Sequence, residues 1–92
     1  MKLLWHAQAW EDYCFWQEND RDVLRRLNAL INDTLRHPFN GIGKPEALRE
    51  QLRGWWSRRI TGGHRLVYRV VGAGDEQRIE IAACRFHYTR RN

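Results

Sequence analysis

The chain has 92 residues, a formal net charge of +5, 42% hydrophobic residues and two cysteines. This length allows a single domain, 1–92, and the apolar content is too high for a disordered chain. Two cysteines are too few for a small secreted disulfide scaffold, and no segment approaches the roughly 20 apolar residues of a membrane span. We therefore expect a cytoplasmic protein with reduced thiols and no membrane partner.

The positive charge lies in the second part of the chain. Residues 1–37 contain five Lys or Arg and six Asp or Glu, net −1, whereas residues 38–92 contain eleven and five, net +6. Fourteen of the 16 basic residues are arginine, whose planar guanidinium matches phosphate and stacks on bases. The pattern indicates a surface for nucleic acid, anionic lipid or an acidic protein, unless the basic face is simply solvated.

The N-terminus predicts a strand followed by a helix. Residues 2–6 form a short apolar run with polar flanks, which suits an edge strand. Residues 7–19 place Trp10, Tyr13 and Cys14 at spacings of three and four, which favours a helix with these side chains on one face.

The second predicted helix has clear boundaries. Asp20 is a good N-cap residue, and an apolar stripe from Val23 to Leu35 follows the helical period. The helix should end at His37–Pro38, because the residue before a proline is pushed out of the helical region.

A long loop and three strands complete the chain. Residues 38–54 form the loop, in which a turn of helix is expected after Pro45. Glycine-containing turns separate three predicted strands, at residues 55–60, 65–71 and 78–88. The predicted fold class is α+β, with a small antiparallel sheet (the N-terminal strand plus the three-strand meander) packed on two helices.

Alternation along the last two strands assigns side chains to the two faces of the sheet. The face expected to pack on the helices carries Leu66, Tyr68, Val70, Ala82, Cys84 and Phe86. The opposite face, which a ligand would meet, carries Arg65, Val67, Arg69, Ile81, Ala83, Arg85 and His87.

The basic part of the chain contains the residue types needed to cleave RNA through its own 2′-OH. Such an enzyme removes a proton from the 2′-OH, protonates the 5′-oxygen leaving group and stabilises charge on the phosphate. The candidates are Glu46, Arg59, Arg65 and His87. The acids are not grouped as in a two-metal site, both cysteines are expected to face the core, and no P-loop spacing is present. We expect neither a metal nor a cofactor.

The chain resembles the YoeB-type toxins of the RelE superfamily of bacterial toxin–antitoxin systems. The resemblance covers nearly the whole chain, and its most diagnostic segments are KLLWHAQAWEDYCFWQ, GIGKPEAL, WWSRRITGGHRLVY and IAACRFHY. It implies a RelE-like fold and a ribosome-dependent, metal-independent endoribonuclease that cuts mRNA in the decoding site. It also implies a homodimer that a YefM/Phd-like antitoxin silences.

The resemblance also implies roles for individual residues. Glu46 would be the general base and His87 the general acid, although the residue types alone allow either to be the base. Arg65, helped by Arg59, would stabilise the phosphate, and Tyr88 would shape the site. We expect further contacts to RNA or the ribosome from Lys44, Arg49, Arg58, Arg69, Arg85, Arg90 and Arg91.

Two alternative functions remain at this stage. One is a non-catalytic member of the same superfamily that resembles the ParE toxins, which poison DNA gyrase. The other is a plain RNA- or polyanion-binding module held by charge alone, whose binding would collapse with added salt.

Overall fold

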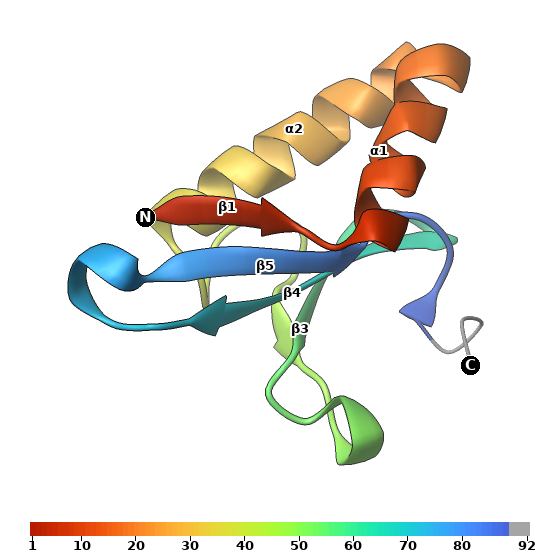
Figure 1. Ribbon diagram of the computed structural model, residues 1–92. Helices are drawn as coiled ribbons and strands as arrows, with labels where there is room; N and C mark the ends of the chain where they lie inside the picture. Colours follow the sequence, from red (N-terminus) through yellow and green to blue (C-terminus); the bar gives the residue numbers. More distant parts are fainter. Residues whose placement is uncertain (89–92) are drawn as a thin grey trace.

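The computed structural model describes residues 1–88 as two helices on one side of a five-stranded sheet (Figure 1). The elements, in chain order, are β1 (Lys2–Trp5), α1 (Ala7–Asn19), α2 (Arg21–Arg36), β2 (Glu46–Ala47), the 3₁₀ helix η1 (Glu50–Leu52), β3 (Trp56–Thr61), β4 (His64–Val71), the 3₁₀ helix η2 (Gly74–Glu76) and β5 (Arg78–Ala83). The predicted α+β class is confirmed. Among these residues, no helix is long and apolar enough to cross a membrane.

Helix α2 forms as its sequence predicts. The Asp20 carboxylate accepts hydrogen bonds from the backbone N–H groups of Asp22 and Val23, at 3.1 and 3.2 Å, and so caps the helix. The apolar stripe turns toward the sheet and buries Leu27 and Leu30 completely. The helix ends before His37, in agreement with the effect of the following proline.

The sheet has the strand order β1-β5-β4-β3-β2, with β1 at one edge as predicted. It is mixed rather than wholly antiparallel, because β1 pairs in parallel with β5, with Lys2 opposite Arg78 and Trp5 opposite Ile81. Parallel neighbours need a long connection. Here the chain leaves β1 through the two helices, reaches β2 at the other edge, and returns to β5 through β3 and β4.

An extra residue in β5 changes the predicted faces. Val67 pairs with Ala83, whereas the next residue, Tyr68, pairs with Ile81, so Ala82 is bulged. The predictions for Ile81 and Ala82 were therefore wrong: Ile81 is buried against the helices, and Ala82 lies in the cluster on the other face.

The last predicted strand also ends earlier than expected. It stops at Ala83 rather than at residue 88, and the chain turns away through Phe86, whose φ is +64°. Phe86 is 38% exposed instead of packing in the core. Cys84 remains buried on the helix side as predicted, Cys14 is partly buried, and the two do not form a disulfide.

In the loop between α2 and β3, the helical turn expected after Pro45 forms only at the 3₁₀ helix η1 and does not begin directly after the proline. Instead, residues 46–47 form the short strand β2 on the edge of β3, and the chain then turns through η1. Leu48 anchors this segment by packing with Val67 and Ala83 on the face of the sheet away from the helices. Figure 1 shows the segment around residue 50 projecting on that side. The sheet thus has a main core under the helices and a smaller cluster on its other face.

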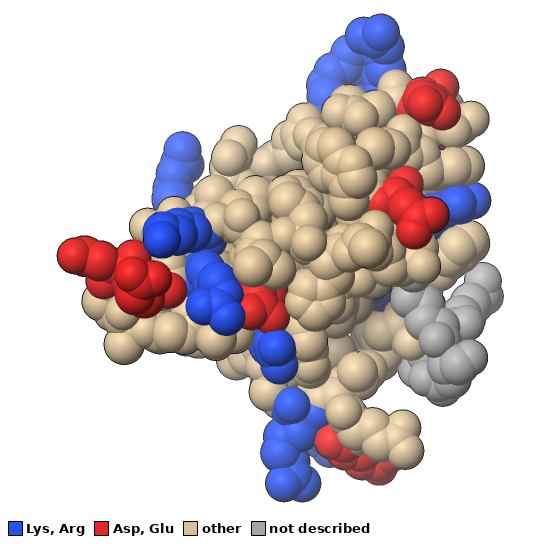
Figure 2. Space-filling model, in the orientation of Figure 1, with Lys and Arg blue, Asp and Glu red and all other residues tan. Residues whose placement is uncertain are grey.

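A buried carboxylate in β5 joins β4 and the residue between β1 and α1, on the face away from the helices. Glu80 accepts hydrogen bonds from His6 at 3.2 Å, from Arg69 at 2.9 and 3.1 Å, and from Arg78 at 2.9 Å. Burial raises the pKa of the Glu80 carboxyl, but these hydrogen bonds outweigh burial and lower the pKa from 4.5 to about 2. Figure 2 shows basic and acidic side chains interspersed over this part of the surface, rather than one continuous basic face.

Replacing Glu80 should change how stability depends on pH. Because the pKa of Glu80 is lowered on folding, its stabilisation is complete above pH 4.5 and is lost as the pH falls toward 2. Glu80→Gln should lower the free energy of unfolding at pH 7 by about 1–3 kcal/mol and flatten its decline in acid. Urea unfolding between pH 7 and pH 2 measures both effects.

The matched control is Glu76→Gln. Glu76 forms a long ion pair with Lys2, 3.7 Å between the charged atoms, and both side chains are exposed. This change should therefore lower the free energy of unfolding by less than about 1 kcal/mol. If the free energy of unfolding of Glu80→Gln fell between pH 4.5 and pH 2 as steeply as that of the wild type, the role assigned to Glu80 would be contradicted.

Candidate active site

The structure brings the five predicted catalytic residues together around one small cavity. The cavity has a volume of about 140 Å³ and lies where β2, β3, β4 and the C-terminal segment meet. Its lining residues are Lys44, Glu46, Ser57, Arg59, Arg65, His87 and Tyr88. Sequence reasoning missed Ser57, although its position two residues before Arg59 on a strand places both on one face.

Strand pairing explains how the charged residues converge. Glu46 lies opposite Ser57 in the β2–β3 pair, and Arg59 lies opposite Arg65 in the β3–β4 pair. Directly paired residues point to the same side of a sheet, here the side away from the helices. Four residues from three strands therefore line one surface.

The Arg59–Arg65 pair creates a positive site at the cavity. Like charges directly opposite each other destabilise a sheet, and Lys44 adds a third cation at the rim. An anion between these groups relieves the repulsion, and a phosphate offers acceptor oxygens to guanidinium groups. The arrangement therefore favours a phosphate-containing ligand.

Arg65 is held in place by the turn that precedes it. Its Nη1 donates hydrogen bonds to the carbonyl oxygens of Thr61 at 2.7 Å, Gly62 at 3.2 Å and His64 at 3.0 Å. Its backbone N–H donates to the Phe86 carbonyl at 3.1 Å. The guanidinium is thus oriented before any ligand arrives, which reduces the entropy lost on binding.

Helix α1 and β4 hold the C-terminal segment that carries His87 and Tyr88. The backbone N–H of Cys84 donates to the buried carboxylate of Asp12 at 3.0 Å, and the Trp16 indole donates to the Cys84 carbonyl at 2.8 Å. Two residues later, the Phe86 N–H donates to Nδ1 of His64 at 2.7 Å. We refer to Asp12, Trp16 and His64 as the C-terminal clamp, because these three contacts fix where the next two residues emerge.

The loop before β2 approaches the body of the protein closely. Gly43 has φ +80°, and a Cβ there would lie 2.5 Å from the Leu30 side chain. Its carbonyl accepts a hydrogen bond from the Arg59 N–H at 2.7 Å. The next residue, Lys44, has φ +53°, which is unusual for a residue with a side chain. Tight packing therefore sets the path that leads to Glu46.

Arg58 organises this loop and is not available to RNA. Its side chain is completely buried and forms an ion pair with Asp33 at 2.6 Å. It also donates to the Tyr68 hydroxyl and to the carbonyl oxygens of His37, Asn40 and Ile42. The hydrogen bond from Arg58 lowers the pKa of the Asp33 carboxyl. We correct the RNA-binding prediction for Arg58, because alternation along β3 turns it into the core while its neighbour Arg59 faces the cavity.

Two other predicted RNA-binding arginines also have protein partners. Arg69 is paired with Glu80, and its guanidinium lies over the Trp55 ring, 4.4 Å from the centroid. The Arg85 guanidinium lies over the Phe15 ring of α1, 3.4 Å from the centroid. Arg85 is therefore on the helix side of the sheet, contrary to the face assigned from the sequence, because the chain has left the strand before it.

Of the four remaining residues predicted to contact RNA or the ribosome, two lie within the described part of the chain. Lys44 lines the cavity described above, and Arg49 lines a second, larger cavity beside it. The predictions for Arg90 and Arg91 lie outside the described residues.

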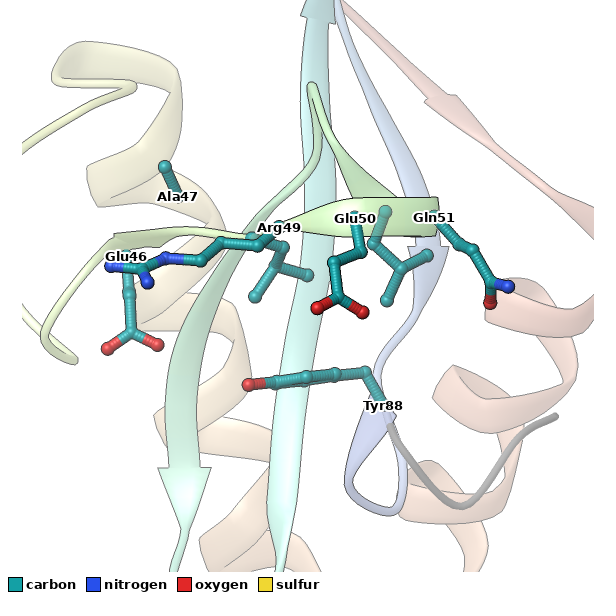
Figure 3. A pocket seen from close by; sticks show the side chains of 8 residues that line it. Glu46, Ala47, Arg49, Glu50, Gln51 and Tyr88 are labelled. Atoms are coloured by element: carbon teal, nitrogen blue, oxygen red, sulfur yellow. The ribbon is translucent and has the colours of Figure 1, made fainter.

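The second cavity has a volume of about 480 Å³ and was not anticipated from the sequence. It is lined by Glu46, Ala47, Leu48, Arg49, Glu50, Gln51, Leu52 and Tyr88. Figure 3 shows the Tyr88 ring lying across it, with the phenol oxygen toward Glu46 and the Glu50 carboxylate directed at the ring. Because Glu46 and Tyr88 line both cavities, the two are contiguous.

The chain is similar to known proteins in both sequence and structure. Residues 5–88 match the model of the YoeB-like toxins of bacterial type II toxin–antitoxin systems. Toxin YoeB of Escherichia coli K12 is 52% identical over 88 residues, which is 96% of this chain and 100% of that protein. A YoeB/ParE toxin structure from Agrobacterium tumefaciens is 53% identical and covers 96% of this chain and 100% of its own, with a TM-score of 0.92.

The Staphylococcus aureus relative has been solved in two assemblies. A heterotetrameric YoeB–YefM toxin–antitoxin complex is 42% identical, covers 96% of this chain and 98% of that chain, and has a TM-score of 0.82. A YoeB dimer from the same organism is 40% identical at the same coverage, with a TM-score of 0.81.

Arg58→Met should destabilise the protein because it leaves the Asp33 carboxylate without its charged partner and removes the donor to three loop carbonyl oxygens. We expect a loss of about 3–5 kcal/mol in the free energy of unfolding, the usual range when one partner of a buried ion pair is removed. The control is Arg59→Met, an exposed position on the same strand, which should change stability by no more than about 0.5 kcal/mol. Equal stability of the two variants in urea unfolding would contradict the role given to Arg58.

Proposed function

This chain belongs to the YoeB-like toxins of bacterial type II toxin–antitoxin systems, and we propose that it is a ribosome-dependent endoribonuclease that cuts mRNA in the decoding site. The observation that carries this proposal is the convergence of Glu46, Arg59, Arg65 and His87 on one cavity of about 140 Å³. A carboxylate, an imidazole and two guanidinium groups supply proton transfer and charge stabilisation at a single phosphate.

The proposed reaction uses the substrate's own nucleophile. Glu46 takes the proton from the 2′-OH, whose oxygen then attacks the adjacent phosphorus. The bond to the 5′-oxygen breaks, and His87 donates a proton to that leaving oxygen. The products are a 2′,3′-cyclic phosphate and a 5′-hydroxyl end, so atoms and protons balance without a metal ion or cofactor.

The arginines stabilise the negative charge that develops on the phosphate oxygens. Arg65 keeps Nη2 and Nε for this task while Nη1 is held by the turn carbonyls. Arg59 approaches from the facing strand. Donors that are oriented in advance stabilise a transition state without the cost of reorganising. Tyr88 lines the cavity beside His87, and the centroids of the two rings are 4.2 Å apart.

The proposed partners follow from the relatives. The S. aureus YoeB–YefM complex supports a YefM-like antitoxin for this chain, and the S. aureus dimer supports a homodimer. The other proposed partners are mRNA and the bacterial ribosome, which place the toxin in the cytoplasm. The net charge of +5 favours association with an RNA-rich target.

Removing the proposed acid, base or phosphate ligand should suppress cleavage without unfolding the protein. We expect Glu46→Gln, His87→Gln and Arg65→Met each to reduce the single-turnover cleavage rate on programmed ribosomes by roughly 10²–10⁴-fold. The measurement is the yield of cut mRNA over time, read by primer extension.

Arg26→Gln, at an exposed position on α2, is the matched control for loss of a charge and should cleave like the wild type. Wild-type cleavage rates in all three site variants would refute the assignment. Growth inhibition without any mRNA cleavage would instead indicate a non-catalytic toxin.

A further inference from the structure

We propose that Ser57 is a further catalytic residue, whose hydroxyl donates a hydrogen bond to the 2′-oxygen of the substrate while Glu46 removes the proton from that oxygen. The inference rests on the proposed nuclease function. It adds a contact to the attacking oxygen that neither the proposed base nor the two arginines supply.

Ser57 is a buried polar residue that faces the smaller cavity. It is only 4% exposed, although serine is mostly found at protein surfaces. It lines the cavity of about 140 Å³ together with Glu46, Arg59 and Arg65. Buried side-chain polar atoms usually have a hydrogen-bond partner, yet within residues 1–88 no group forms a hydrogen bond with the Ser57 hydroxyl. This hydroxyl is therefore available to a ligand in the cavity.

Strand register places Ser57 beside the proposed base. It lies directly opposite Glu46 in the β2–β3 pair, so the two side chains leave the same face of the sheet, with their Cβ atoms about 4.5–5.5 Å apart. Arg59 is two residues further along β3 on that face and lies opposite Arg65. A substrate with its phosphate at the arginines and its 2′-OH at Glu46 therefore brings the 2′-oxygen next to Ser57.

The hydrogen-bonding capacity of the 2′-OH leaves a place for one donor. This hydroxyl gives its single hydrogen to the Glu46 carboxylate, which can only accept. Its oxygen keeps two lone pairs, of which one must point at the phosphorus for attack. The other lone pair can accept a hydrogen bond. Ser57 supplies a donor in the same row of the sheet as Glu46, whereas Arg59 and Arg65 form the next row and face the phosphate.

The proposed contact becomes stronger as the reaction proceeds. Negative charge grows on the 2′-oxygen as its proton moves to Glu46, and a hydrogen bond to a charged group is stronger than one to a neutral group. An interaction that is stronger in the transition state than in the ground state raises the rate. Strand β3 has β2 on one side and β4 on the other, so Ser57 is held in place before the substrate binds. Ser57 keeps its own proton, and the proton balance of the reaction is unchanged.

The first test removes the hydroxyl. Ser57→Ala should reduce the single-turnover cleavage rate on programmed ribosomes by roughly 10- to 150-fold, the range expected for a hydrogen bond to a charged group. Ser57→Thr keeps a hydroxyl and should stay within a few-fold of the wild type. The control is Thr34→Val, which removes a hydroxyl that binds the Leu30 carbonyl within α2, at 2.7 Å, and should cleave like the wild type. Urea unfolding checks that each variant is folded under the assay conditions.

The second test separates the attacking oxygen from the leaving oxygen. It uses an mRNA with sulfur in place of the bridging 5′-oxygen at the cut, because a thiolate leaves without being protonated. This substrate should restore His87→Gln to nearly the wild-type rate. The rate of Ser57→Ala should remain roughly 10- to 150-fold below that of the wild type, because its defect lies at the nucleophile.

The pH dependence of cleavage separates a contact to the 2′-oxygen from a contact to Glu46. A hydroxyl that held the Glu46 carboxylate would favour its ionised form, so Ser57→Ala would lose activity in acid at a higher pH than the wild type. With the contact at the 2′-oxygen, the rates of Ser57→Ala and the wild type should fall in acid at the same pH.

Four results would overturn the inference while leaving the nuclease function intact. They are a Ser57→Ala rate within two-fold of the wild type, a Ser57→Thr rate as low as that of Ser57→Ala, recovery of Ser57→Ala on the sulfur-containing mRNA, and an acid decline moved to higher pH in Ser57→Ala. Failure of the wild type to cut any mRNA would instead refute the proposed function.

Discussion

The buried guanidinium of Arg58 is the interaction on which the geometry of the site depends. It gathers Asp33 from α2, the Tyr68 hydroxyl from β4 and three carbonyl oxygens of the loop into one hydrogen-bonded cluster. A charge this deeply buried is tolerated only when its donors are matched with acceptors. The loop therefore has one path, and that path places Lys44 and Glu46 beside β3.

The C-terminal clamp fixes the position of the segment that carries His87, as Arg58 fixes the loop that carries Glu46. Asp12 and Trp16 reach from α1 to Cys84, and His64 reaches from β4 to Phe86, so His87 and Tyr88 follow from a fixed point. Neither group of anchoring contacts touches a substrate. Each positions one of the two proposed proton-transfer groups, while the sheet between them supplies Arg59 and Arg65. Hydrogen bonds between residues far apart in the sequence thus position both groups at the cavity.

Sequence reasoning predicted the elements that depend on local pattern. Helix α2 has an N-cap, an amphipathic stripe and a proline after its end, and all three act within a few residues. The sequence also supplied the five residues that meet at the cavity. What it could not predict was set by partners far along the chain. Arg58 and Arg59 are identical neighbours that alternation turns to opposite faces of β3, and the partner that makes burial of Arg58 possible, Asp33, lies 25 residues away. The bulge at Ala82 inverts the faces of Ile81 and Ala82. The parallel pairing of β1 with β5 joins strands from the two ends of the chain.

The most direct test of the account is the chemical identity of the RNA ends that the protein produces on programmed ribosomes. Attack by the 2′-OH, with Glu46 as base and His87 as acid, predicts a 5′-hydroxyl on the downstream fragment and a 2′,3′-cyclic phosphate on the upstream one. The downstream fragment should then accept label from a polynucleotide kinase without prior phosphatase treatment. A 5′-phosphate on that fragment would mean that water, and not the substrate's own hydroxyl, is the nucleophile, and it would contradict the mechanism.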